Sequence, residues 1–69
     1  MEKTFETKHG AVTLRKAMLE AEDNTTLNEG IEIVIAGKLE AEVLEAHIDL
    51  DEISVEGVEE FVETFVEYL

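Results

Sequence analysis

The sequence predicts an α+β fold: a small antiparallel β-meander of three to four strands, with one C-terminal amphipathic α-helix packed on a face of the sheet. Two observations support this prediction. Apolar residues recur at steps of three and four through residues 54–69, which is the period of one helix face. Earlier stretches instead alternate apolar and polar residues, the period of a half-buried strand. A chain of 69 residues forms a single small domain.

The C-terminal helix has the clearest pattern. Ser54 stands at the N-cap position, where a hydroxyl can accept a hydrogen bond from an amide of the first turn. The same apolar stripe fits heptad a and d positions for two repeats, so a dimer seam is the alternative to packing on the protein's own sheet. The stripe consists of Val55, Val58, Phe61, Val62, Phe65, Val66 and Leu69.

A hairpin is expected at the N-terminus. Residues 3–8 alternate, and His9-Gly10 can form a two-residue loop because glycine tolerates the positive φ of a hairpin turn. This loop would pair Thr7 with Val12. The pairing places the apolar side chains of both strands on one face of the sheet.

Residues 11–22 fit two interpretations. As a strand they place Val12, Leu14 and Met18 on one face, whereas as a helix they place Leu14 and Met18 together and have high helical propensity. We favour the strand because the preceding turn starts a hairpin. Residues 23–30 have the composition of a loop.

The third and fourth strands are expected at residues 31–36 and 39–43, which are rich in isoleucine, valine and leucine. A three-residue loop at 36–38 would pair Ile35 with Leu39. It would also place the apolar side chains of both strands on one face, which a two-residue loop would not do.

Beyond residue 43 the alternation slips by one position and continues to residue 50. A β-bulge near Val43-Leu44 would produce this slip, so we expect the fourth strand to continue past it. A helix over residues 39–47 is the alternative, because the apolar residues there also lie near one helical face.

The charge balance excludes several functions. The chain has 18 acidic and five basic side chains, and from residue 17 onward it has sixteen acids and one lysine. A surface with a net charge of −13 repels nucleic acids and anionic membranes and attracts basic proteins. No apolar run approaches the roughly 18 residues of a membrane span, and the N-terminus lacks the apolar core of a signal peptide. We therefore expect a cytoplasmic protein.

Catalytic and metal-binding patterns are weak. The chain has no cysteine, and its single serine, Ser54, is explained as a helix cap. His9 falls in a turn and His47 in an acidic stretch, so each is expected to be an ordinary surface residue. The acids at 49–52 lack the glycine and the alternating oxygen ligands of a calcium loop. We expect no enzyme activity, no cofactor and no metal site.

The acidic surface supports the main functional hypothesis. Duplex DNA carries one negative charge per about 1.7 Å of its axis, and carboxylates in rows on rigid elements can imitate that array. On the helix, four glutamates form a row at steps of four, three and four: Glu56, Glu60, Glu63 and Glu67. On the sheet, the expected register sets Glu32 opposite Glu42. The residues expected to bind a partner are Glu32, Glu40, Glu42, Glu56, Glu59, Glu60, Glu63 and Glu67.

In size, charge and lack of catalytic groups, the chain resembles the small acidic inhibitors carried by phages and mobile elements, DNA mimics and anti-CRISPR proteins among them. The resemblance implies a non-enzymatic inhibitor that docks on a basic, nucleic-acid-handling protein. The alternative is a small structural or assembly module that forms a homodimer through apolar contacts, because domains of this size often gain stability from a second subunit.

Overall fold

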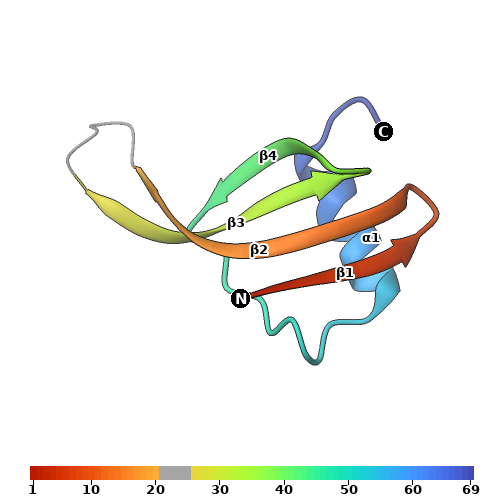
Figure 1. The fold of residues 1–69 in the computed structure, drawn as a ribbon, viewed down its shortest axis with the longest axis horizontal. Coiled ribbons are helices and arrows are strands. Elements are labelled where there is room, and N and C mark those ends of the chain that lie inside the picture. Colours follow the sequence, from red (N-terminus) through yellow and green to blue (C-terminus); the bar gives the residue numbers. More distant parts are fainter. Residues whose placement is uncertain (21–25) are drawn as a thin grey trace.

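The computed structural model describes residues 1–20 and 26–69 as a four-stranded sheet with one helix (Figure 1). Each strand pairs antiparallel with its neighbour in the chain, so the strand order is β1-β2-β3-β4. The predicted α+β meander with a C-terminal helix is therefore confirmed. Within the described ranges, no helix is long and apolar enough to cross a membrane. The elements are β1 (Glu2–Thr7), β2 (Gly10–Glu20), β3 (Leu27–Ile35), β4 (Lys38–Leu44) and α1 (Val55–Phe65).

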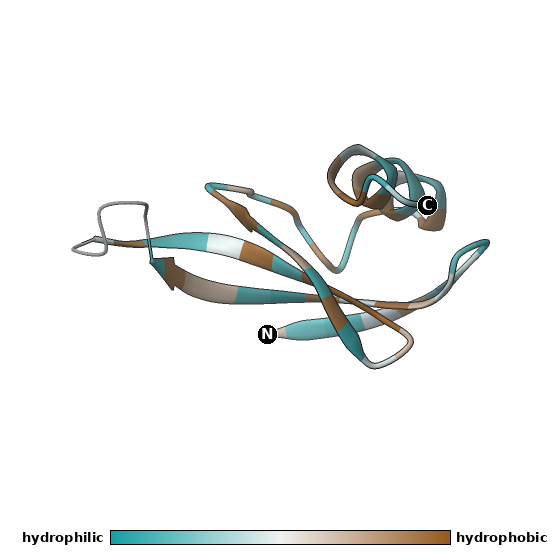
Figure 2. Ribbon diagram, turned by 90° about the horizontal axis from the view of Figure 1, so that it is seen from above, coloured by the Kyte–Doolittle hydropathy of each residue, from teal (hydrophilic) through white to brown (hydrophobic). Residues whose placement is uncertain are grey.

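The hydrophobic core lies between α1 and one side of the sheet (Figure 2). We call this side the core face and the opposite, uncovered side the outer face. Val58 and Val62 of α1 are fully buried, and burying such a side chain contributes about 1.5–3 kcal/mol. The centre of the helical stripe therefore packs on the protein's own sheet. The core consists of Phe5, Val12, Leu14, Ile31, Ile33, Leu50, Val58, Val62 and Val66.

The helix starts as predicted but ends earlier. Ser54 is the N-cap, and its Oγ accepts a hydrogen bond from the Gly57 N–H at 3.0 Å. The last helical residue is Phe65, so the expectation of a helix to Leu69 is wrong. Val66 has an extended backbone, yet its side chain stays in the core. The apolar pattern in the sequence extends past the end of the helix because Val66 is buried in the core although it is not helical.

The first hairpin turns one residue earlier than predicted, with a loop of the same length. Thr7 pairs with Gly10 rather than with Val12, so the loop is Lys8-His9, and Gly10 follows it with φ of 94°. A register shift of two residues keeps every side chain on the same face, and the apolar pattern therefore could not distinguish the two pairings. The strand interpretation of residues 11–22 is confirmed as far as β2 extends, and the helical alternative is wrong.

The hairpin of β3 and β4 matches the prediction in its middle and differs at its turn. The pairs Ile31–Val43 and Glu32–Glu42 form as expected. The turn, however, has only two residues, both with positive φ: 52° at Ala36 and 82° at Gly37. These are the angles of a turn whose twist matches that of the strands it joins.

The β-bulge lies nearer the turn than predicted. The register shifts between Ile33 and Val34, which leaves Glu40 as the extra residue of β4, instead of a bulge near Val43-Leu44. Because of this shift, Leu39 pairs with Val34 rather than with Ile35. Its side chain consequently leaves the core face and is 45% exposed.

Two connecting segments also differ from expectation. Residues 27–30 belong to β3 rather than to a loop, while residues 23–25 of that expected loop lie outside the described part of the chain. β4 ends at Leu44, so neither the long strand to residue 50 nor the helix over 39–47 forms. The alternating residues Ala46, Ile48 and Leu50 nevertheless pack on the core from a segment that joins no ladder.

Candidate functional site

The eight glutamates expected to bind a partner lie on two separate surfaces. Glu32 and Glu42 face each other on the outer face of the sheet, because they alternate with the buried residues of the core face. Glu40 lies in the bulge of β4 and is half-buried. The remaining glutamates lie on or just after α1, which packs on the opposite side of the sheet. The predicted residues therefore do not form one continuous surface.

Two of the helix glutamates bind the first hairpin. Glu59 Oε2 accepts a hydrogen bond from the backbone N–H of Lys8 at 2.8 Å. Glu63 Oε2 lies 2.7 Å from His9 Nε2 and 3.1 Å from Lys8 Nζ. We call Lys8, His9, Glu59 and Glu63 the turn latch, because these contacts hold the β1–β2 turn against α1.

The turn latch shifts the pKa of Glu63 and of Lys8. The hydrogen bond from His9, followed by that from Lys8, holds the pKa of Glu63 below its ordinary value. In turn, the hydrogen bond and the negative charge of Glu63 raise the pKa of Lys8. All these groups stay partly exposed, so solvent weakens the interaction. The latch nevertheless occupies two of the carboxylates expected to meet a partner.

Only two helix glutamates remain exposed and unpaired among the described residues. Glu56 and Glu60 are four positions apart, which corresponds to a rise of about 6 Å along a helix. Glu67 was expected in the same row, but it follows the end of α1 and is not on the helix. The predicted row of four carboxylates therefore reduces to one pair.

A charged row crosses the outer face from edge to edge. The strand registers align Glu2, Arg15, Glu32 and Glu42, one on each strand, at an interstrand spacing of about 4.8 Å. Arg15 Nε lies 3.2 Å from Glu32 Oε1, and this contact is an ion pair without hydrogen-bond alignment. Glu42 stands beside Glu32 and has no ion pair within the described part of the chain.

A hollow of about 560 Å³ lies at the end of this row. Its lining includes Leu19, which packs closely on Gly30: a Cβ on Gly30 would lie 2.5 Å from the Val43 carbonyl oxygen and 2.6 Å from Leu19 Cδ1. We call this cavity the outer-face hollow. Sequence analysis missed it, although a glycine inside a strand often marks a close approach of this kind. Its lining is Ala17, Met18, Leu19, Glu20, Glu32, Glu42 and Leu44.

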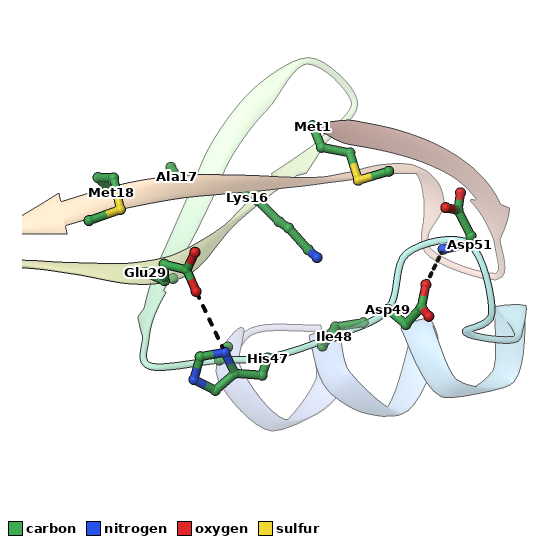
Figure 3. A pocket seen from close by; sticks show the side chains of 11 residues that line it. Met1, Lys16, Ala17, Met18, Glu29, His47, Ile48, Asp49 and Asp51 are labelled. Carbon is green, nitrogen blue, oxygen red and sulfur yellow. Dashed lines mark hydrogen bonds and ion pairs between the residues drawn. The ribbon is translucent and has the colours of Figure 1, made fainter.

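A second cavity of about 610 Å³ lies between the β2–β3 hairpin and the segment that follows β4 (Figure 3). Lys16 points into it, and Glu29 and His47 lie to one side. The Glu29 and His47 side chains are 3.9 Å apart and both largely exposed, so their interaction is weak. Asp49 uses one oxygen to accept the backbone N–H of Asp51 at 3.0 Å. Among the described residues that line this second cavity, none has a hydroxyl or thiol that could act as a nucleophile.

The acids near His47 do not gather around a common point. In residues 1–20 and 26–69, no group of three or more histidine, aspartate or glutamate side chains is arranged to hold a metal ion. Comparison with known proteins finds no matching family model, and no curated protein or solved structure that matches significantly. The surface of the chain itself is therefore the basis for a functional proposal.

Proposed function

We propose that this protein is a non-enzymatic acidic binding protein that docks its carboxylate-rich surface on a basic, nucleic-acid-handling partner. The observation that carries the proposal is the one-sided charge of −13 on a folded domain. Two of the five cations, Lys8 and Arg15, are already held by the protein's own carboxylates. Solubility alone does not require a surface of a single sign, whereas attraction of a basic partner does.

The positions of the carboxylates support a mimic of nucleic acid phosphates. Glu32 and Glu42 project from adjacent strands, and Glu56 and Glu60 from one side of a helix, so the backbone already orders each pair. Because little ordering is needed on binding, such pairs can attract a phosphate-binding surface at a small entropic penalty. The partner's nucleic acid and this protein would then compete for one site.

Competition with DNA is the direct test. Tagged protein is used to capture partners from a bacterial lysate at low salt, and each captured protein is then bound to a fluorescent duplex. The proposal expects the acidic protein to displace the duplex, and displacement to weaken as salt rises. Capture of nucleic-acid-binding proteins that keep their duplex in an excess of this protein would overturn the proposal.

Charge-reversal variants identify the surface involved. Glu56→Lys with Glu60→Lys tests the helix, and Glu42→Lys tests the sheet. Glu2→Lys with Glu6→Lys on β1 changes the net charge as much as the helix pair does and serves as the matched control. Reversal in the contact surface should slow association by about tenfold at low salt and much less at high salt. An equal loss in the helix variant and its control would assign the effect to net charge alone.

Self-association through apolar contacts is the second candidate. Phe65, Tyr68 and Leu69 are 45%, 68% and 43% exposed near the C-terminus. The rings of Phe61 and Phe65 lie 5.0 Å apart, which forms a small aromatic surface beside the core. Light scattering over a range of concentration tests this candidate. A dimer that persists at all salt concentrations and dissociates in Phe65→Ser would favour it over the acidic docking protein.

A further inference from the structure

One edge of the sheet has backbone groups free to pair. Among the strands that the structure describes, β4 has a neighbour on one side only, β3. The Glu45 N–H donates to the Glu29 carbonyl at 2.8 Å, and bonds toward a neighbouring strand recur at every second residue of an antiparallel ladder. The backbone groups of Glu42 and Leu44 therefore point away from β3. Over the described part of the chain, no backbone hydrogen bond outside the ladders reaches β4.

The other edge, β1, is better covered. The ammonium of Lys3 lies 5.4 Å from the centre of the Phe5 ring, and Phe5 itself is already in the core. The turn that follows β1 is held by the turn latch. By contrast, Ala41 and Val43 of β4 pack at the margin of the core and remain partly exposed. An added strand would therefore bury more apolar surface at β4 than at β1.

The charges on the outer face indicate what this strand would carry. In the charged row that crosses the outer face, Arg15 stands between Glu2 and Glu32. Glu32 and Glu42, by contrast, are adjacent like charges. Like charges directly opposite each other are unfavourable, and a cation on the next strand would lie beside Glu42 and restore the alternation. The outer-face hollow adjoins this position: it lies over β2, β3 and β4, its lining combines the two glutamates with aliphatic side chains, and a long side chain from the next strand would reach it across β4. A lysine or arginine suits it, since the aliphatic stem and the charged head would both be matched.

We propose that the open edge of β4 binds an extended segment of the basic partner as a fifth strand. An arginine or lysine of that segment enters the outer-face hollow between Glu32 and Glu42, and apolar residues lie beside Ala41 and Val43. Pairing at a sheet edge draws affinity from the main chain and specificity from alternate side chains. The inference rests on the proposed function for the sign of the partner's charge. A second copy of the chain is disfavoured because it would bring another −13 to the same edge.

A short peptide serves as the probe. It has about eight residues of alternating valine and threonine with one central arginine, is blocked at both ends, and is compared with the same peptide carrying glutamate instead. Hydrogen exchange of the Glu42 and Leu44 amides, measured by NMR, should slow by at least about tenfold with the arginine peptide. The glutamate peptide should not slow it. No slowing at millimolar peptide, or equal slowing with both peptides, would overturn the proposal.

Three variants separate the edge from its charge. Leu44→Pro removes an N–H that points away from β3, so it should abolish peptide binding while leaving the sheet folded. Glu42→Gln retains the N–H and should weaken binding several-fold, with loss of the preference for arginine. Thr4→Pro makes the equivalent change at the β1 edge and should bind the peptide as the unmodified protein does. Peptide binding retained in Leu44→Pro would refute the assignment to β4.

Duplex displacement distinguishes this inference from the proposed function. If Leu44→Pro still displaces DNA from the partner as well as the unmodified protein does, the edge is not the docking site and the proposed function stands. If the arginine peptide pairs with β4 but no nucleic-acid-binding partner releases its duplex, the edge site stands and the proposed function fails.

Discussion

Substitution of Leu50 tests how the helix is joined to the sheet. Leu50 lies in the segment between β4 and α1, makes no ladder contact, and is only 1% exposed in the core. It is the only residue of that connection that is fully buried. Replacing it with alanine removes the anchor that holds the connection under the sheet and leaves a cavity beside α1.

The expected loss is large compared with the total stability. A Leu→Ala change at a fully buried position lowers the free energy of unfolding by about 3–5 kcal/mol. At about 0.05–0.15 kcal/mol per residue, a domain of this length has a total stability of about 3–10 kcal/mol. Leu50→Ala should therefore remove at least about a third of the stability, and all of it at the lower end of that range. Leu39→Ala deletes the same atoms at a half-exposed site and should lower the stability by less than about 1 kcal/mol.

Urea unfolding followed by circular dichroism measures both variants. With an m value of about 1 kcal/mol per M for a small protein, Leu50→Ala should lower the midpoint by several molar, or abolish the folded baseline. Leu39→Ala should shift the midpoint by less than about 1 M. Similar losses in the two variants would refute the assignment of Leu50 as the anchor of the connection.

Three further changes test local features of the fold. Ser54→Ala removes the helix cap and should lower the stability by about 1 kcal/mol in thermal unfolding, whereas Ser54→Asp should retain most of it. Gly30→Ala places a Cβ against the Val43 carbonyl oxygen and against Leu19, and should lower the stability in urea by about 1–3 kcal/mol; an unchanged midpoint would contradict the close packing around Gly30. The turn latch lowers the pKa of Glu63 below its ordinary value of 4.5. The contribution of the turn latch to stability is therefore complete above about pH 4.5 and is lost as the pH falls through the lowered pKa of Glu63. Glu63→Gln should flatten this acid dependence and Glu60→Gln should not, as measured by unfolding at a series of pH values.

The α+β class could be predicted because local patterns determine it. The helix period and the Ser54 cap are properties of neighbouring residues; the helix starts where expected and ends four residues earlier, at Phe65. The middle register of the second hairpin was also predictable, since a slip of one residue at Ile31 or Ile33 would have moved an isoleucine out of the core. In the first hairpin, a slip of two residues leaves every side chain on the same face of the sheet. The apolar pattern therefore could not locate the first turn.

The missed features depend on contacts between distant parts of the chain. The turn latch joins residues 51 and 54 positions apart, and neither the acids nor the bases involved differ locally from their neighbours. The outer-face hollow is lined by residues of three strands, and Leu19 in its wall meets Gly30 across the hairpin. Leu50 belongs to an alternating stretch that resembles a strand, but the stretch joins no ladder and packs its apolar side chains on the core instead. Tertiary packing determines all three features.

The meander order has a consequence for how the chain folds. Every ladder joins neighbours in sequence, so the sheet can assemble by closing short loops, whereas docking of α1 on β1 closes a loop of about 50 residues. We therefore expect the sheet to form first, with its apolar side briefly uncovered before the helix docks. Such intermediates aggregate when copies meet, and mutual repulsion between chains of charge −13 opposes that encounter. The same carboxylates that suit a basic partner would thus also protect the chain while it folds.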